Sequence, residues 1–259
     1  MKNKPQLTIV KIGGNVIDDP VALDNFLKDF AAVQGPKILI HGGGKLATRT
    51  AESLGIKAVF HEGRRITDAP MLEIAVMTYA GWINKSIVAK LQALGDNAMG
   101  FTGADGNLIR SKKRDNTTVD FGLVGDVVAV NTELLNALLV QDIAPVFCAV
   151  THDGNGQLLN TNADAIASPL AVACTGYYDV KLLYCFEKKG VLLDVNDEDS
   201  VIKTLTFESY SKLREEGAIH SGMLPKLENC FNALNQGVSQ IGIGSPAMIN
   251  GEAHTLITS

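Results

Sequence analysis

Short apolar runs rich in β-branched residues alternate along this chain with segments of helical periodicity. The clearest runs cover residues 7–12, 37–41, 98–102, 144–150, 180–185 and 239–243. Alternation of this kind predicts an α/β fold, a three-layer αβα sandwich in which helices cover both faces of a mostly parallel, open sheet. A length of 259 residues fits one large domain or two lobes that share this sheet.

The alternating pattern is interrupted by a Cys-Thr-Gly sequence at residues 174–176, after a helical segment, and this interruption divides the chain. We predict an N-terminal lobe over residues 1–176 and a C-terminal lobe over residues 177–259. Within the first lobe, residues 107–113 and 123–130 are predicted to form a hairpin or small lid. Its basic tip, residues 112–116, is interpreted as a solvated turn.

Charge and composition limit the kind of partner. The net charge of −5 argues against nucleic acid or an anionic membrane as the main partner. No apolar run approaches the roughly 18 residues of a membrane span, and the start lacks a signal-peptide pattern, so we expect a cytoplasmic protein. Four cysteines stand in apolar segments without a CxxC spacing, which predicts reduced core residues: Cys148, Cys174, Cys185 and Cys230.

The strongest helical pattern covers residues 70–94. A second apolar set, Ile74, Met77 and Trp82, lies off its main stripe, so this helix has apolar residues on two sides. We interpret the second side as the interface of a homodimer, with a central core helix as the alternative. The main stripe follows three- and four-residue steps through Leu72, Val76, Tyr79, Ile83, Ile87, Leu91 and Leu94.

Two lysines stand where an ordinary fold does not favour them. Lys11 interrupts an apolar strand, and Lys226 falls at the start of an amphipathic helix, where a cation opposes the helix dipole. Both positions make sense if an anion of high charge density lies between them, such as a phosphoryl group in transfer. Asp164 is the natural counter-charge for a buried lysine, and Asn162 is predicted to cap the helix that carries it.

Glycines follow two of the predicted strands. Gly13 and Gly14 end the first strand, and three glycines follow His41 before the next helical pattern. Backbone N–H groups at such junctions bind anions, although Leu46 rules out a Walker A loop. The histidines lack the spacing of metal or triad chemistry. One arginine of the pair Arg64-Arg65 is a candidate to grip a carboxylate in two hydrogen bonds.

Five motifs in register resemble the amino acid kinase family over nearly the whole chain. They are Lys11-x-Gly13-Gly14, His41-Gly42-Gly43-Gly44, Gly63-Arg64-Arg65-Ile66-Thr67, Asn160-Thr161-Asn162-Ala163-Asp164 and Gly222-Met223-x-x-Lys226. The resemblance implies the two-lobed amino acid kinase fold. Within the family, it favours the members of arginine biosynthesis that phosphorylate the γ-carboxylate of N-acetylglutamate, or of N-succinylglutamate.

The resemblance also implies residue roles. Lys11 and Lys226 are expected to stabilise the transferring phosphoryl group, Asp164 to orient both, and Gly13 and Gly14 to donate hydrogen bonds. The acylated glutamate is expected at Gly43, Gly44, Arg65, Asn160 and Asn162, with Arg65 on its α-carboxylate. ATP is expected on the second lobe with Mg²⁺ held mainly by its phosphates, and no metal ligand is named from the protein. The expected ATP contacts are Glu187, Lys188, Lys189, Gly190, Val191, Leu192, Ala218, Ile219 and His220.

Two features depart from the family pattern. The nucleotide segment, usually Leu-Ser/Thr-Asp-Val-x-Gly-Val, reads Cys-Phe-Glu-Lys-Lys-Gly-Val at residues 185–191. Arginine-inhibited members carry an additional helix before the first strand, whereas only six residues precede Leu7 here. We therefore expect no arginine feedback through that element, and a homodimer instead of a hexamer.

Two alternatives stay open. The acceptor of a related amino acid kinase is free glutamate, carbamate or a nucleotide, and the five motifs alone leave these possible. A non-catalytic effector-sensing domain on the same fold is the second alternative, and the unusual segment 185–189 favours it. The retained Lys11, Asp164 and Lys226 argue against a non-catalytic domain.

Overall fold

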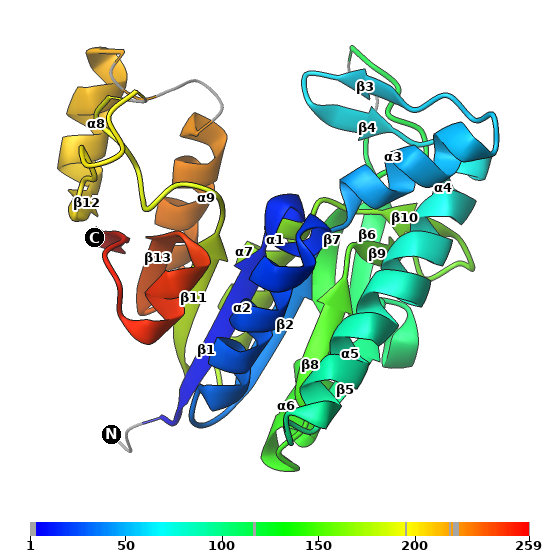
Figure 1. The fold of residues 1–259 in the computed structure, drawn as a ribbon, viewed down its shortest axis with the longest axis horizontal. Helices are drawn as coiled ribbons and strands as arrows, with labels where there is room; N and C mark the ends of the chain where they lie inside the picture. The colour runs from blue at the N-terminus through cyan, green and yellow to red at the C-terminus, as the bar shows by residue number, and fades with distance from the viewer. Residues whose placement is uncertain (1–3, 116–117, 195, 218, 220–222, 259) are drawn as a thin grey trace.

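An eight-stranded sheet runs through the centre of the computed structural model, which describes residues 4–115, 118–194, 196–217, 219 and 223–258 (Figure 1). All neighbouring strands are parallel except one pair near an edge, β13 with β14. The predicted α/β fold with a mostly parallel sheet is confirmed. In spatial order the strands are β12 (Thr204–Thr206), β14 (Thr255–Thr258), β13 (Gln240–Gly244), β11 (Asp179–Cys185), β1 (Gln6–Ile12), β2 (Lys37–His41), β8 (Ala144–Cys148) and β5 (Ala98–Phe101).

Helices cover both faces of the sheet. Figure 1 shows α2 and α5 on one face and α7 on the other, and α7 also contacts α9. Two short 3-10 segments, η2 (Asp105–Asn107) and η3 (Pro246–Asn250), lie in connections. The α-helices are α1 (Gly14–Asp18), α2 (Pro20–Ala32), α3 (Gly44–Ser53), α4 (Ala69–Ala75), α5 (Asn84–Ala93), α6 (Thr132–Val140), α7 (Ala163–Cys174), α8 (Phe207–Glu215) and α9 (Leu224–Asn235).

The sheet crosses the predicted lobe boundary at residue 176 without a break. Strand β11 from the second part of the chain pairs with β1 from Gln6 to Ile12. The strands after residue 177 all lie on one side of β1, and those between β1 and residue 176 lie on the other. The division into lobes 1–176 and 177–259 stays a prediction.

Two smaller sheets stand beside the main one. The predicted hairpin of residues 107–113 and 123–130 is confirmed as an antiparallel pair. The single strand predicted over residues 144–150 is wrong, because β8 ends at Cys148 and the next residues join a different sheet. Both pieces are buried, so an apolar pattern does not mark where the chain changes sheet. The smaller sheets contain β10 (Leu158–Asn160), β9 (Val150–His152), β6 (Ile109–Lys113) and β7 (Gly125–Val130), and β3 (Val59–His61) with β4 (Arg64–Ile66).

The helix predicted over residues 70–94 has a π-helical centre, η1 (Val76–Ile83), between α4 and α5. The main apolar stripe is buried or half-buried, except Leu94, which follows the end of α5 and is exposed. Met77 is 53% exposed and Trp82 71% exposed, whereas Ile74 is buried. The wider π turn changes the angular spacing of side chains, so a 3.6-residue pattern misplaces residues around it. The predicted second apolar surface therefore keeps Met77 and Trp82 only.

Two expectations from composition have clear outcomes. All four cysteines are free and buried, as predicted. Burial raises the pKa of the Cys148, Cys174, Cys185 and Cys230 thiols to about 12, so they stay protonated. In the described part of the chain, no helix combines the length and apolar character that a membrane crossing requires.

His41 ends β2 inside the core. Its Nδ1 donates to the carbonyl oxygen of Gly42 at 2.8 Å, and its Nε2 accepts from the side-chain amide of Asn84 at 3.0 Å. Asn84 also donates to the carbonyl of Val146 at 2.9 Å, which joins the helical layer to β8. Burial lowers the pKa of His41 to about 4, so the ring stays neutral near neutral pH.

This environment predicts a pH dependence of stability. Between pH 6.5 and 4 the unfolded chain protonates His41 and the folded protein does not, so the free energy of unfolding falls as pH decreases in this range. His41→Gln should lose this component, worth about 3 kcal/mol at its limit. Chemical denaturation of both proteins from pH 7 to 4 measures the difference in slope. Equal slopes would contradict a neutral, buried His41.

Candidate active site

A cleft of about 870 Å³ opens at the carboxyl ends of β1 and β2. Ligands of open α/β sheets bind at this end of the strands, where the strand-to-helix loops meet. The segments that line the cleft are far apart in sequence and include residues 11–14, 42–44, 62–65, 160–165 and Lys226. The cleft lining therefore contains residues from all five sequence motifs.

Asp164 contacts both predicted lysines. Its Oδ1 lies 2.8 Å from the Nζ of Lys11, and its Oδ2 lies 3.6 Å from the Nζ of Lys226. Burial by itself raises the pKa of Asp164, but the two ammonium groups outweigh it and hold that pKa below its ordinary value. Asp164 is therefore ionised near neutral pH. The two cations converge on one carboxylate, as the sequence led us to expect.

Three different elements hold these charges in place. Lys11 lies in β1 between two neighbouring strands, and its side chain is only 12% exposed. Lys226 lies in the first turn of α9, with its Nζ 5.2 Å from the centre of the Phe186 ring. Asn162 caps α7 by accepting the backbone N–H of Asp164 at 2.8 Å, which confirms the predicted cap. The catalytic roles of Lys11, Lys226 and Asp164 stay predictions.

The glycine loop needs glycine for space. A Cβ on Gly43 would lie 2.2 Å from the Cδ1 of Ile83 and 3.0 Å from the ring of Tyr79. Gly43 also serves as the N-cap of α3 and has no side chain to accept the first N–H groups of that helix. The loop that begins α3 lines the cleft, so the first backbone N–H groups of this helix are available to a bound anion.

Arg65 is held against this loop. Its Nη2 donates to the carbonyl of Gly44 and to the hydroxyl of Thr48, both at 2.8 Å. The guanidinium also lies 4.6 Å from the centre of the Phe60 ring. These contacts fix a planar cation on the cleft wall, in reach of a bound carboxylate.

Asn160 contacts the segment that follows the arginine hairpin. Its side-chain amide donates to the hydroxyl of Thr67 at 3.0 Å, immediately before the cap of α4. Asp68 provides that cap by accepting the N–H of Met71 at 2.9 Å. The first asparagine of the Asn-Thr-Asn-Ala-Asp motif therefore ties the start of α7 to the arginine hairpin.

Within the described chain, the structure does not bring the predicted nucleotide residues 187–192 into the cleft lining. Lys188 pairs with Glu198 at 2.7 Å, and Lys189 pairs with Asp199 at 3.0 Å. Gly190 and Val191 pack against Thr255: a Cβ on Gly190 would lie 2.6 Å from the Thr255 hydroxyl, which accepts the N–H of Val191. Leu192 forms a bridge with Val201, Ile219 is buried, and Glu187 is exposed. Ala218 and His220 lie outside the described residues.

Sequence reasoning missed Arg114 and Tyr79, which both line the cleft. The Lys112 side chain is exposed, as the interpretation of a solvated tip predicts, but this interpretation is wrong for Arg114, whose Nε donates to both oxygens of Asp126 at 3.2 Å. No local signal could find this pair, because Asp126 lies across the hairpin. Tyr79 was recognised only as part of an apolar stripe, and burial raises its pKa.

The cleft is positively charged although the chain is acidic. Its lining contains five basic residues and two acidic ones, in a protein of net charge −5. A low-dielectric cleft with this balance attracts a polyanion. The lining is Lys11, Arg64, Arg65, Arg114 and Lys226 against Glu62 and Asp164.

A family comparison agrees with the motifs. The model of the amino acid kinase family matches residues 6–245. The chain belongs to the amino acid kinase family. Two relatives named acetylglutamate kinase support a closer placement within it. The protein of Phocaeicola vulgatus is 52% identical over 254 residues, covering 98% of this chain and 99% of the relative. The protein of Cytophaga hutchinsonii is 55% identical over 237 residues, covering 91% and 90%.

The same fold occurs in solved structures. The N-acetylglutamate synthase of Neisseria gonorrhoeae, solved with coenzyme A and N-acetyl-glutamate, superposes with a TM-score of 0.81 at 19% identity. The match covers 99% of this chain and 60% of the synthase chain. At this identity the likeness supports the amino acid kinase fold and nothing finer.

The shared carboxylate predicts an energetic coupling. Asp164→Ala leaves two lysines without their counter-charge and should cost about 2 kcal/mol of unfolding free energy, and Lys11→Met a similar amount. In the double variant the loss should be clearly smaller than the sum of the two. The exposed pair Lys90–Asp24 is the control, with the same two single variants and one double variant, and it should show a coupling energy of less than about 1 kcal/mol. Urea denaturation measures both cycles, and equal coupling energies would contradict the buried ion pair.

Proposed function

We propose that this chain transfers the γ-phosphoryl group of ATP to the γ-carboxylate of N-acetylglutamate, in arginine biosynthesis. The observation that carries the proposal is the contact of Asp164 with both Lys11 and Lys226 in a positively charged cleft. The relatives named acetylglutamate kinase, about half identical over nearly the full chain, support the choice of acceptor.

The acceptor needs alignment more than deprotonation. A γ-carboxylate has an ordinary pKa of about 4.3 and is already ionised at pH 7. One of its oxygens forms the new bond to phosphorus while the bond from phosphorus to the β,γ-bridging oxygen breaks, and ADP leaves with that electron pair. Lys11 and Lys226 would stabilise the negative charge on the phosphoryl and bridging oxygens. Asp164 would keep both ammonium groups oriented, without accepting a proton itself.

The acceptor would lie between the glycine loop and the arginine hairpin. Arg65 would bind its α-carboxylate, because its planar guanidinium is fixed beside Gly44. Backbone N–H groups at Gly43 and Gly44 would face the reacting carboxylate. Asn160 would bind the acylated amino group, and Asn162 would support the same network through the cap of α7. N-succinylglutamate is the alternative acceptor, and an assay with a panel of acceptors distinguishes it from N-acetylglutamate.

The nucleotide and its metal fit this arrangement. Mg²⁺ bound to ATP would neutralise phosphate charge, and it would not act as a base. Among the described residues, no group of three or more histidine, cysteine, aspartate or glutamate side chains is arranged to hold a metal ion. In this proposal phosphate oxygens would hold the ion, with Gly13, Gly14 and Lys226 on the phosphates. The nucleoside contacts at Glu187–Leu192 and at Ala218–His220 stay predictions.

The homodimer would form through the helical segment over residues 69–93. Met77 and Trp82 expose a large apolar surface there, and a second copy of the same helix would cover it. The cytoplasmic location stays a prediction.

A trapping assay tests the function. Protein, Mg²⁺, ATP and hydroxylamine are incubated with N-acetylglutamate, N-succinylglutamate, free glutamate, carbamate or a nucleoside monophosphate. An acyl phosphate forms a hydroxamate, and we expect it with an N-acylglutamate and not with free glutamate. A hydroxamate from free glutamate alone, or ADP formation with only carbamate or a nucleotide, would support a related amino acid kinase. Ligand binding by calorimetry without ADP formation would support a non-catalytic sensor.

Lys226→Ala should lower kcat by a factor that corresponds to about 2–4 kcal/mol of barrier, the cost of losing one transition-state donor. The fold should persist, since the Lys226 side chain is partly exposed and at the start of α9. Steady-state kinetics with both substrates measures the effect, and Lys212→Ala on the exposed face of α8 is the control. If kcat survives and only KM for ATP rises, the assigned role is wrong.

A further inference from the structure

Tyr184 lies beside Lys11 on the neighbouring strand of the sheet. The two residues are partners in the parallel register of β1 and β11, so their side chains point to the same face. That face is covered by α7, which contacts both strands. Tyr184 is 2% exposed, and its hydroxyl lies 2.6 Å from the hydroxyl of Ser168 on α7.

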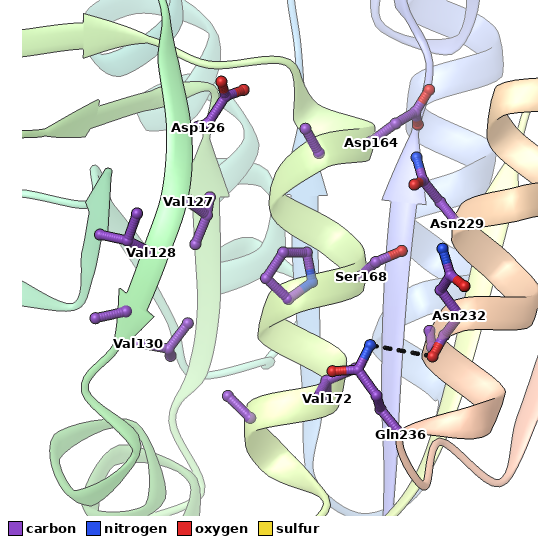
Figure 2. A pocket seen from close by; sticks show the side chains of 15 residues that line it. Asp126, Val127, Val128, Val130, Asp164, Ser168, Val172, Asn229, Asn232 and Gln236 are labelled. Atoms are coloured by element: carbon purple, nitrogen blue, oxygen red, sulfur yellow. Dashed lines mark hydrogen bonds between the residues drawn. The ribbon is translucent and has the colours of Figure 1, made fainter. Parts of the chain in front are cut away.

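Ser168 lies one helical turn after Asp164. Residues four apart share a face of an α-helix, and Figure 2 shows both side chains on the same side of α7. Two polar contacts therefore join the sheet to this helix, one turn apart. Lys11 pairs with Asp164 in the first turn of α7, and Tyr184 bonds to Ser168 one turn later.

The residue after Ser168 makes the hydrogen bond between Tyr184 and Ser168 important. Pro169 lies inside α7 and has no backbone N–H, so it cannot bond to the carbonyl of Ala165. The first turns of α7 are consequently joined to the rest of the helix by one bond fewer than an ordinary helix. The hydrogen bond is missing at the residue directly after Ser168, where the hydroxyl of Tyr184 holds the helix to the sheet.

A purely structural role does not require a hydroxyl here. The other side chains of β11 near Tyr184, those of Leu182, Leu183 and Cys185, are buried and apolar. A buried hydroxyl costs free energy unless it is hydrogen-bonded, and phenylalanine would fill the same volume without that requirement. The polar contact is therefore specific to this position.

We propose that Tyr184, acting through Ser168, is a positioning residue that fixes the first turns of α7 so that Asp164 holds Lys11 and Lys226 in the geometry for phosphoryl transfer. This inference rests on the proposed function for its kinetic consequence. Its structural consequence is independent of the proposed function, because the position of Asp164 between two ammonium groups can be measured without turnover.

The kinetic test removes only the hydroxyl. Tyr184→Phe should lower kcat about tenfold, the scale of a small misplacement of catalytic groups, and leave KM for both substrates nearly unchanged. Ser168→Ala should have the same effect, and the double variant should be no slower than either single variant. Ser168→Thr keeps the hydroxyl and should retain more activity than Ser168→Ala. An unchanged kcat in Tyr184→Phe would overturn the proposal.

Tyr178→Phe is the matched control. Tyr178 is also a buried residue, and its hydroxyl donates to the side-chain oxygen of Asn136 at 2.8 Å. It precedes β11 at the amino end of the sheet, six residues or about 20 Å of strand from Tyr184. Both variants should lose similar thermal stability, but only Tyr184→Phe should lose kcat. A loss of kcat that is equal in both variants would show a general packing effect and overturn the proposal.

A second readout needs no turnover. Carbon-13 NMR follows the titration of the Asp164 carboxyl group, whose pKa is held low by Lys11 and Lys226 against the opposing effect of burial. Tyr184→Phe should raise this pKa, because a looser α7 no longer keeps both ammonium groups at the carboxylate, and Tyr178→Phe should leave it unchanged. An unchanged titration in Tyr184→Phe would overturn the positioning role. Wild-type protein that forms no acyl phosphate would contradict the proposed function alone, and this titration would still decide the positioning role.

Discussion

One carboxylate between two ammonium groups organises this protein. Asp164 lies 2.8 Å from Lys11 and 3.6 Å from Lys226, and each of the three side chains comes from a different element of the fold. Removing Asp164 would leave both ammonium groups without their shared counter-charge in a partly buried cleft. The sheet, α7 and α9 must therefore meet at this point for the cleft to exist.

The surrounding structure serves the same geometry. Parallel strands bring Lys11 and the glycine loops to one edge of the sheet, and the cap by Asn162 fixes the first turn of α7. The contact of Tyr184 with Ser168 holds that helix one turn further along, beside Pro169, which donates no backbone hydrogen bond. A reaction that relies on alignment and positive charge needs such rigid support more than it needs an acid or a base.

The sequence singled out the three charges that meet in the cleft, but it misplaced some of the elements around them. Lys11 and Lys226 stand out because a charge in an apolar strand, or a cation at the amino end of a helix, costs free energy unless an anion balances it. Arg114 had no such signal, because its partner Asp126 lies across a hairpin. The strand over residues 144–150 was mispredicted because both of its pieces are buried, and the π-helical centre of the long helix shifted the apolar pattern.

The sequence by itself determined the α/β class, the mostly parallel sheet, the family and the residues that carry charge into the core. These follow from local periodicity and from short motifs, which the chain contains before it folds. Only the tertiary structure decided that Arg114 of the cleft pairs with Asp126, and that the Glu187–Leu192 segment lies outside the cleft lining. Contacts between residues far apart along the chain depend on strand order and helix packing, and neither leaves a local pattern in the sequence.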